Sequence, residues 1–569
     1  MADHLTHRGP DEHGVFVDDD VVLAVRRLAV IDPTHGQQPL HGPGGRVLVA
    51  NGEIYGHQRL RQRFPSHPYR SGSDLEVIHP LVQQYGDDFL SHLPGTFALA
   101  LWDPIQTSLL LARDRYGERP LYWTLLSDGC LAFSSEVGAL REVGLISGRL
   151  DLVSISEMLR QGYVPPDRSI WEDVSSLPHA SHLRFTPGGQ PQVTRWWTPP
   201  DPTPSRRSAP TDVQGFRADL DRAVQDQLVA DVPVGTLLSG GLDSSAISVL
   251  AHRHHPGITA FTCEVPGNSE LSFAREVADR HGIDLQVLSA ADIDLPQCFL
   301  DVAGVWDEPF GDTSTIPTML LSRFVRESVK VALTGDGADE LLGGYLTWTR
   351  GMLPPTDPIR GGDQAVLRKI LRRLRGSARS GGESQVAQQF AGFRSYFSPT
   401  ELVRLGLPPT SPEGVDVSTY DTGTLEDICR FDLDHYLPGD ILVKTDRASM
   451  AVGLEVRAPF LDQRLAERCH RLPPSQKADA HQEKLILREA VRDLLPDSVI
   501  ERSKRGFGSP MSSWLTDPGV QELIRHTVGD PGSKVGRILD SEVAATYMDQ
   551  PDQRLWNLLT FGLWAEQSI

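Results

Sequence analysis

The chain has 569 residues, of which 39% are hydrophobic and 23% charged, with a formal net charge of −20 and a pI near 5.4. This composition is that of a globular protein, and the length calls for two or three domains. The acidic charge argues against nucleic acid as the main partner. The sequence contains no run of about 18 apolar residues, which is the length that a membrane-spanning helix requires. The polar opening MADHLTHRGPDEHG lacks the apolar core of a secretory signal, so we expect a cytoplasmic protein.

Short apolar runs bounded by glycine, proline and aspartate predict strands in the first third of the chain. These runs are VVLAV at 21–25, RVLVANGEIY at 46–55, FALALWD at 97–103 and SLLLARDRYG at 108–117. A proline-rich stretch, PPDPTPSRRSAP at 199–210, then predicts a semi-rigid linker. We therefore expect one domain over residues 1–198, a linker over 199–211 and a second domain over 212–569.

The second part opens with helical periodicity from Gly215 to Val229 and then alternates strand-like with helical runs. This alternation predicts parallel strands joined by crossover helices, in an α/β domain. Beyond about residue 350 the pattern is mostly helical. The one dense basic run, RKILRRLRGSAR at Arg368–Arg379, indicates a solvated helix face or surface loop. A docking site for an acidic substrate or carrier protein is its alternative interpretation.

The strongest chemical signal is VGTLLSGGLDSSAISVL at Val234–Leu250, where an apolar run, a glycine turn and a helical stretch follow one another. Backbone N–H groups at such a turn and helix start bind anions, and glycines let the backbone approach a phosphate closely. The loop is not of the Walker A type, because it lacks GxxxxGK[ST]. Asp243 would repel phosphates unless a cation such as Mg²⁺ lies between them. The alternative is a Ser/Gly-rich turn that only caps a buried helix.

A second loop repeats the design in VKVALTGDGADELLGGY at Val329–Tyr345. The carboxyl ends of neighbouring parallel strands are where such sheets bind ligands, so Asp339 and Asp243 are expected to share one magnesium ion. Asp339 and Glu340 could equally serve only to complement the dipole of the helix that they enter.

Together these loops resemble the ATP-pyrophosphatase domain of glutamine-hydrolysing asparagine synthetases. Further matches follow in order: DEPFGDTSTIPTMLLSR at 307–323, YLPGDILVKTDRASMAVGLEVRAPFLD at 436–462, KLILREAVRDLLP at 484–496 and KRGFGSP at 504–510. Upstream, the glutaminase half of the family is matched by HRGPD at 7–11, RRLAVID at 26–32, NGEIY at 51–55, SGSD at 71–74, RDRYG at 113–117 and FSSEVGAL at 133–140.

The resemblance implies an N-terminal αββα sandwich of the N-terminal-nucleophile (Ntn) hydrolase type. A doubly wound parallel-sheet domain would follow it, with a mostly helical C-terminal part. It implies an enzyme that activates a carboxylate with ATP to an acyl-adenylate, releases pyrophosphate and forms an amide with ammonia from glutamine. Partners would be these small molecules, without nucleic acid or membrane, and a homodimer stays open.

Site residues are carried over by the same resemblance. Asp243 and Asp339 would bind Mg²⁺, and Asp336, Glu455 and Lys484 would act at the acyl centre. Either carboxylate could accept a proton from the attacking amine, and the lysine could neutralise charge on the phosphate. Glu455 with Arg457 could instead be a structural ion pair, and Lys484 a surface helix residue. The ATP-binding positions would be Leu237, Ser239, Gly240, Gly241, Asp243, Ser244, Ser245, Cys263 and Gly335.

In the glutamine half, Arg27 would pair with the glutamine α-carboxylate. Asn51 and Gly52 would supply oxyanion-hole donors, and Glu53 and Asp74 would bind the substrate ammonium. The family's nucleophile is a cysteine at residue 1 of the processed chain. Here Met1-Ala2-Asp3 stands in place of Met-Cys-Gly-Ile.

The positions of the cysteines confirm that the family's nucleophile is missing from the start of this sequence. They are Cys130, Cys263, Cys298, Cys429 and Cys469, so the first 129 residues contain none. They form no CxxC pair, which excludes a disulfide scaffold or zinc knuckle and fits a reducing compartment. Two explanations of the missing nucleophile compete: a lost glutaminase, or a native start that lies upstream. We favour the second, because the first strand of the sandwich is missing along with the cysteine while the rest of the glutamine pocket is kept.

The amidated acid is the least determined feature. One subgroup of asparagine-forming relatives carries an arginine in the loop before LSR, whereas Asp312–Pro317 here has none. Asp336 argues against β-lactam formation, since those relatives place a tyrosine there. The Ala-, Arg- and Pro-rich composition suits a high-GC bacterial genome, so the expected acid is aspartate or a secondary-metabolite acid. Two alternatives stay open: a glutaminase-dead ligase that uses a non-ammonia amine, and a non-catalytic nucleotide-binding regulator.

Overall fold

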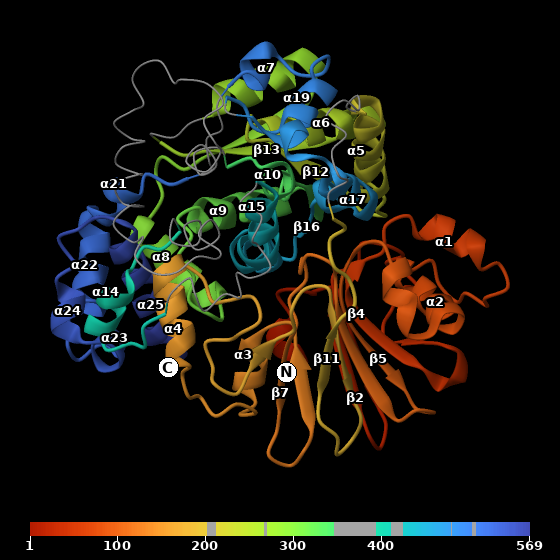
Figure 1. The fold of residues 1–569 in the computed structure, drawn as a ribbon, viewed down its shortest axis with the longest axis horizontal. Helices are drawn as coiled ribbons and strands as arrows, with labels where there is room; N and C mark the ends of the chain where they lie inside the picture. Colours follow the sequence, from red (N-terminus) through yellow and green to blue (C-terminus); the bar gives the residue numbers. More distant parts are fainter. Residues whose placement is uncertain (202–211, 267–269, 346–393, 411–424, 480, 503–507) are drawn as a thin grey trace.

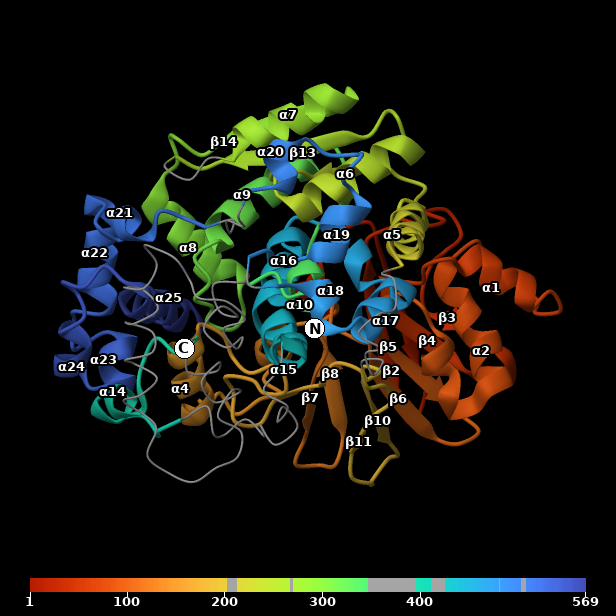
Figure 2. The ribbon, with the colours of Figure 1, turned by 45° about the horizontal axis from the view of Figure 1, so that its top comes forward.

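A computed structural model of the chain describes residues 1–201, 212–266, 270–345, 394–410, 425–479, 481–502 and 508–569. The N-terminal strands, red to orange in Figure 1, stand apart from a second sheet at the top of the view. The helices near the C-terminus, in blue, gather beside both (Figures 1 and 2). Most of the proline-rich linker and the whole basic run Arg368–Arg379 lie outside the described residues.

A six-stranded antiparallel sheet in the order β11-β10-β6-β5-β4-β3 is the centre of the N-terminal half. Each of the four runs predicted as strands overlaps one, and the strands at 46–55, 97–103 and 108–117 lie in this sheet. Its central strand β5 is buried along its whole length, because apolar clusters cover both faces of the sheet. The strands are β3 (Leu40–His41), β4 (Val47–Glu53), β5 (Thr96–Asp103), β6 (Ser108–Arg113), β10 (Ser181–Phe185) and β11 (Gln192–Arg195).

Helices α1 (His57–Arg63) and α2 (Ile78–Tyr85) belong to one side of this sheet, and two smaller sheets to the other (Figure 1). The first small sheet pairs β1 (Glu12–Val17) with β2 (Val22–Arg27), and the second has the order β8-β7-β9. Its members are β7 (Tyr122–Leu125), β8 (Leu131–Ser134) and β9 (Ser175–Ser176), and helices α3 (Val137–Glu142) and α4 (Leu152–Gln161) lie between β8 and β9 in the chain. The stacked layers agree with the expected sandwich.

The second half is built on a fully parallel five-stranded sheet in the order β14-β13-β12-β15-β16. The chain runs outward from β12 to β14 and then returns to the other side of β12 with β15. This reversal puts the carboxyl ends of β12 and β15 side by side, which is where open α/β sheets bind ligands. The strands are β12 (Val234–Leu237), β13 (Thr259–Glu264), β14 (Asp284–Ser289), β15 (Val331–Leu333) and β16 (Glu455–Arg457).

Helices connect and cover this sheet. The predicted helix near Gly215–Val229 is α5 (Val213–Gln227), which an Asp212 side chain caps by accepting the Gly215 N–H. The others before the gap at 346–393 are α6 (Leu242–His254), α7 (Leu271–His281), α8 (Leu295–Val305), α9 (Thr315–Arg326) and α10 (Ala338–Leu342).

From residue 394 onward, the described chain is helical apart from β16. Those helices are α14 (Pro399–Arg404), α15 (Leu425–Phe431), α16 (Leu442–Met450), α17 (Gln463–Arg471), α18 (Pro474–Lys477), α19 (Leu485–Ala490), α20 (Asp497–Ile500), α21 (Met511–Leu515), α22 (Pro518–Thr527), α23 (Lys534–Ile538), α24 (Ser541–Ala545) and α25 (Gln553–Ser568). The apolar helix α25 buries Trp556 and Trp564 in a core shared with α4 and α8. No helix in the described ranges is long and apolar enough to cross a membrane.

A buried network of charges joins the two halves. Arg8 holds Asp446 with two hydrogen bonds of 2.8 Å each and reaches Glu136 at 2.9 Å. Arg447 contacts Glu136 at 2.9 Å and Asp307 at 3.0 Å. Burial alone would raise the pKa of Asp446, but the guanidinium groups of Arg8 and Arg447 hold it below its ordinary value. The orientation of the halves therefore depends on charges that have no access to water.

We expect Asp446→Asn to lower the free energy of unfolding by about 3–5 kcal/mol, because it removes one of the two carboxylates that neutralise the buried Arg8. Urea denaturation followed by circular dichroism measures this change. The control is Glu172→Gln, which removes the partner of Arg149 in a pair at 2.7 Å whose side chains are 52% and 73% exposed. That variant should stay within about 0.5 kcal/mol of the parent. Equal losses in the two variants would contradict a special role for the buried network.

Candidate functional site

The loops that follow β12 and β15 touch each other. A Cβ atom added to Gly335 would lie 2.9 Å from both the Asp243 Cβ and the Ser244 nitrogen, so only glycine fits there. Gly240 has a φ of +85°, which favours glycine, and a Cβ there would lie 2.7 Å from the Ala274 nitrogen. The glycines thus permit the close packing of these loops against each other and against their neighbours.

The loop after β12 ends at the start of α6, a 13-residue helix whose N-cap is Gly241. The hydroxyls of Ser239 and Ser244 lie 2.9 Å apart, and the Ser239 N–H donates to the Ser244 hydroxyl at 3.2 Å. Free N–H groups and hydroxyls at a helix start form a place for phosphate oxygens. Arg502, which the sequence analysis missed, donates to the Gly240 carbonyl at 3.0 Å and supports the loop from outside.

The other residues predicted to bind ATP lie in strands or inside a helix rather than in the loop after β12. Leu237 is the last residue of β12, next to the loop. Cys263 lies near the end of the neighbouring strand β13, and burial raises the pKa of its thiol to about 11. Ser245 is fully buried in α6, so its side chain belongs to the helix packing rather than to an open loop.

Lys484 brings the two predicted metal ligands together. Its Nζ lies 2.5 Å from Asp243 Oδ2 and 2.7 Å from Asp339 Oδ1. The lysine is only 2% exposed and has a left-handed backbone with a φ of 56° just before α19. The alternative of a surface helix residue is therefore wrong. A conformation that non-glycine residues rarely adopt aims this ammonium between two carboxylates.

The pair of aspartates fits a divalent cation. Asp243 Oδ1 is buried and accepts no hydrogen bond from the described residues, so one carboxylate oxygen is left for a further ligand. Oxygen ligands are what Mg²⁺ prefers, and it needs only one or two carboxylates when phosphates supply the rest. Within the ranges that the structure describes, no cluster of three or more His, Cys, Asp or Glu side chains forms a protein-only metal site.

Two further polar groups stand near this centre. Thr445 donates its hydroxyl to Asp336 Oδ2 at 3.0 Å. Lys444, one residue earlier, contacts Asp312 Oδ2 at 2.7 Å, and this ammonium helps to lower the pKa of Asp312 to about 2 against the effect of burial. The loop that lacks the arginine of some relatives thus has a lysine from α16 beside it. Lys444 lies inside a motif that the sequence analysis quoted, but no spacing rule singled it out.

Glu455 and Arg457 on β16 form the ion pair of the alternative interpretation, with Arg457 Nε donating to Glu455 Oε1 at 2.7 Å. Arg457 Nη2 also lies 3.7 Å from Glu53 Oε1 in the N-terminal half. The structure therefore brings one predicted glutamine residue, Glu53, and one predicted acyl-centre residue, Glu455, to the same guanidinium.

The predicted glutamine residues gather at the end of β4. Asp74 accepts the Ile54 N–H at 2.6 Å, and burial together with nearby Glu455 raises its pKa to about 6. Burial, Asp74 and Glu455 also raise the pKa of Glu53 well above its ordinary value. Together with Glu455, these buried carboxyl groups outnumber the two guanidinium groups beside them, and a substrate ammonium would supply a further positive charge.

The remaining glutamine residues lie nearby. The Nδ2 group of Asn51 is buried without a hydrogen-bond acceptor among the described residues, so it is able to donate to a ligand. Gly52 has a φ of 153°, and a Cβ there would lie 2.1 Å from the Thr96 carbonyl oxygen. Arg27 donates to Glu12 at 2.7 Å and to the Ile31 carbonyl at 2.6 Å, so a substrate carboxylate would have to share it with Glu12.

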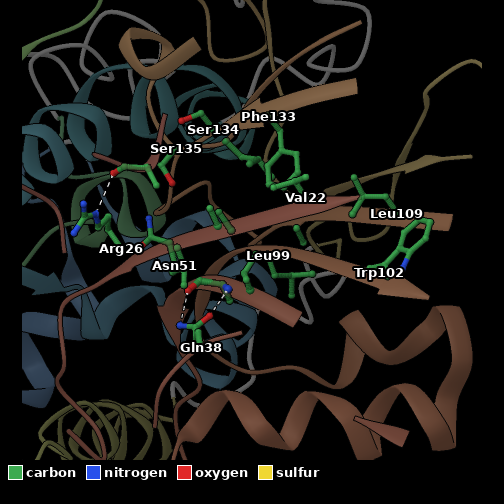
Figure 3. Close-up of a pocket in the computed structure, with 18 of the residues that line it drawn as sticks. Val22, Arg26, Gln38, Asn51, Leu99, Trp102, Leu109, Phe133, Ser134 and Ser135 are labelled. Atoms are coloured by element: carbon green, nitrogen blue, oxygen red, sulfur yellow. Dashed lines mark hydrogen bonds between the residues drawn. The ribbon is translucent and has the colours of Figure 1, made fainter. Parts of the chain in front are cut away.

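A large cavity of about 790 Å³ opens beside these residues (Figure 3). One end is lined by Asn51, Glu53 and Asp74, and the other by the turns at 18–20 and 128–130. Apolar side chains of the six-stranded sheet, including Trp102 and Leu109, line it between these ends.

Two strand edges border the same cavity. Among the described strands, β2 pairs only with β1, and β8 only with β7, while residues of both β2 and β8 line the cavity. Val22 of β2 and Phe133 of β8 both appear in the close-up, and Val22 is 62% exposed. The cavity is thus bounded by two edges with unused backbone hydrogen-bonding groups and by an apolar face, which is what a β-strand requires.

Comparison with known proteins gives two family matches. Residues 215–566 match the asparagine synthase family, and residues 1–197 match the glutamine amidotransferase domain. The chain belongs to the asparagine synthase family. Its members that are named glutamine-hydrolysing asparagine synthetases are ligases. This asparagine synthase family protein is therefore a ligase as well.

Its similarity to relatives extends over nearly the whole chain. It is 32% identical over 626 aligned positions to a Mycobacterium tuberculosis protein with the asparagine synthetase name, covering 99% of this chain and 92% of that protein. It is 29% identical to asparagine synthetase 1 of Bacillus subtilis, covering 100% of this chain and 93% of the relative. With asparagine synthetase 2 of Arabidopsis thaliana the identity is 36% over 61% of this chain and 57% of that protein.

We expect glutamine binding to this asparagine synthase family member to weaken below pH 6. A raised acid pKa means that Asp74 is neutral below about 6 and charged above it, and only the charged form attracts an ammonium. Calorimetric titration should show affinity about tenfold lower at pH 5 than at pH 7.5, from the ionised fraction alone. Asp74→Asn should bind weakly at both pH values, and equal parent affinities at the two would contradict the assignment.

Proposed function

We propose that this ligase activates a carboxylic acid with ATP as an acyl-adenylate and then converts it to an amide with ammonia. The observation that carries the proposal is the meeting of Asp243, Asp339 and Lys484 at the carboxyl ends of β12 and β15. Two carboxylates and an ammonium beside a glycine-rich helix start suit the triphosphate of ATP with a divalent cation. Residues 1–198 would form the glutamine domain and residues 212–569 the ligase domain, with 199–211 between them.

In the first step, a carboxylate oxygen of the acid attacks the α-phosphorus of ATP, and pyrophosphate leaves. Backbone N–H groups and hydroxyls at Ser239–Ser244 would hold the phosphates. Mg²⁺ on Asp243 and Asp339 would neutralise the charge of the pyrophosphate. Lys484 would then lie beside the departing phosphates and stabilise the charge that builds there.

In the second step, ammonia attacks the acyl carbon, AMP leaves with the original carboxylate oxygen, and one proton must be removed from nitrogen. Asp336 and Glu455 are the two candidates for the proton acceptor. Glu455 accepts a hydrogen bond from Arg457 Nε at 2.7 Å, and Asp336 accepts one from the Thr445 hydroxyl at 3.0 Å. Glu455 therefore acts only if Arg457 loosens its hold.

The acid is aspartate or a secondary-metabolite acid, and Lys444 is the buried cation nearest to the acceptor loop Asp312–Pro317 in the contacts described. Lys444 is held by Asp312 at 2.7 Å, so an acid that reaches it must compete with that contact. A panel of carboxylic acids is the direct way to find the substrate.

The test is ATP-dependent pyrophosphate release with Mg²⁺, ammonium and a panel that begins with aspartate. We expect release with at least one acid and a loss of about 10²-fold or more in Asp243→Asn, in line with removing one charged group from a transition state. The matched control, Asp221→Asn, changes a residue of α5 whose side chain is 42% exposed, and should keep full activity. No release with any acid would favour the nucleotide-binding regulator instead.

We also propose that a further β-strand carrying a cysteine nucleophile occupies the cavity between β2 and β8 when the enzyme hydrolyses glutamine. The two bordering edges, the apolar lining at Trp102 and Leu109, and the unsatisfied Asn51 Nδ2 at its end support this. An added strand would satisfy the backbone groups of both edges and join the two small sheets into one.

A synthetic peptide tests this proposal. It would begin with Cys-Gly and continue with alternating apolar residues, and its control would begin with Ala-Gly. We expect both peptides to bind, and only the cysteine peptide to produce glutamate from glutamine. Asn51→Ala should reduce that activity at least tenfold, because it removes an oxyanion donor. Failure of both peptides to bind would contradict the proposal and leave a ligase that uses free ammonia or another amine.

A further inference from the structure

Two of the three guanidinium nitrogens of Arg457 have hydrogen-bond acceptors in the described chain, and the third has none. Its Nε donates to Glu455 at 2.7 Å, and its Nη1 donates to the carbonyls of Gln227 at 2.7 Å and Val229 at 2.8 Å. Its Nη2 is buried and makes no hydrogen bond within the described chain. That atom points to Glu53 Oε1, which lies 3.7 Å away.

An unpaired arginine nitrogen is unusual here because the side chain of Arg457 is almost completely buried. Arg457 is 1% exposed, so water does not satisfy the Nη2 donors. A buried guanidinium donor left unpaired is costly, and a carboxylate less than 1 Å beyond hydrogen-bond distance is the natural acceptor. The arginine itself is held by its two carbonyls, so the movable partner is Glu53.

Carboxyl groups outnumber guanidinium groups around Arg457, and a bound ammonium would correct this imbalance of charge. Glu53, Asp74 and Glu455 bring three carboxyl groups, which face two guanidinium groups, those of Arg457 and Arg119. Arg119 donates to the Val456 carbonyl at 3.3 Å, between the other two residues of β16. The α-ammonium of glutamine would supply a third positive charge beside Glu53 and Asp74, and so favour an ionised Glu53.

We propose that Arg457 is a positioning residue that couples glutamine occupancy to the acyl centre. A glutamine ammonium charges Glu53, which then closes on Nη2 of Arg457, so that the fixed guanidinium shares its charge between Glu53 and Glu455. Glu455, with its arginine shared, becomes able to accept the proton of the attacking ammonia. This inference rests on the proposed glutamine pocket and on the proposed amide synthesis.

The coupling is tested with ammonium kept saturating, so that ammonia released from glutamine cannot itself raise the rate. Ammonium-dependent pyrophosphate release is measured with the best acid of the panel, with and without saturating glutamine. We expect glutamine to raise kcat about fivefold or more, the lower range of couplings between sites. The KM for ATP should change less than kcat, because the effect acts on proton removal.

The decisive variant is Arg457→Lys, which keeps the positive charge but lacks the second N–H arm. It should bind glutamine within about threefold of the parent affinity by calorimetry, yet lose the stimulation of kcat. Arg471→Lys is the matched control, since that arginine is 56% exposed and pairs only with Glu467 at 3.6 Å, and it should keep the full stimulation.

A second variant covers the case in which Arg457→Lys does not fold. Glu53→Asp keeps the carboxylate but withdraws it from Nη2 by about one methylene, so it should weaken glutamine binding and abolish the stimulation even at saturation. Glutamine binding without stimulation in the parent, or full stimulation in either variant, would overturn the inference. Ammonium-dependent release with no glutamine binding would remove the glutamine pocket and this coupling but leave the ligase function standing.

Discussion

The reversal of strand order between β12 and β15 is the constraint on which the rest of the molecule depends. It leaves the carboxyl ends of these strands adjacent, and the two loops that follow can meet only because Gly335 has no side chain. Asp243 and Asp339 are thereby brought to one ammonium, that of Lys484, which arrives from a distant helix start. The proposed phosphate site is therefore a consequence of topology, and the side chains complete it.

The second feature is a set of buried ion pairs that connect the two halves of the molecule. Arg8, Glu136, Asp446 and Arg447 form a buried network, and Arg457 separately links β16 to Glu53. Buried charges are stable only with their partners, so each half needs the other to keep its charged residues satisfied. This arrangement fixes the distance between the residues proposed to bind glutamine and those proposed for the acyl centre. It also gives a physical route by which one site responds to the other.

Much of this was predictable from sequence where the signal was local. The apolar run and glycine turn of Val234–Leu250 predicted strand, loop and helix, and the second loop predicted its neighbour, because parallel strands end at the same edge. The three-residue strand β16 was missed, since LEVRAPF is too short for periodicity to show. Lys484 could not be placed with its aspartates, because its position depends on a left-handed backbone and on packing far along the chain. The open guanidinium arm of Arg457 has no sequence signal at all.

The central claim is that the carboxylate becomes bonded to the α-phosphorus of ATP before nitrogen enters. It is tested most directly with an acid substrate labelled with ¹⁸O in its carboxylate, followed by mass spectrometry of the nucleotide product. If the acid attacks the α-phosphorus and the nitrogen then attacks the acyl carbon, one ¹⁸O atom must leave on AMP, and the pyrophosphate must be unlabelled. Label in inorganic phosphate together with ADP, or unlabelled AMP, would contradict this account.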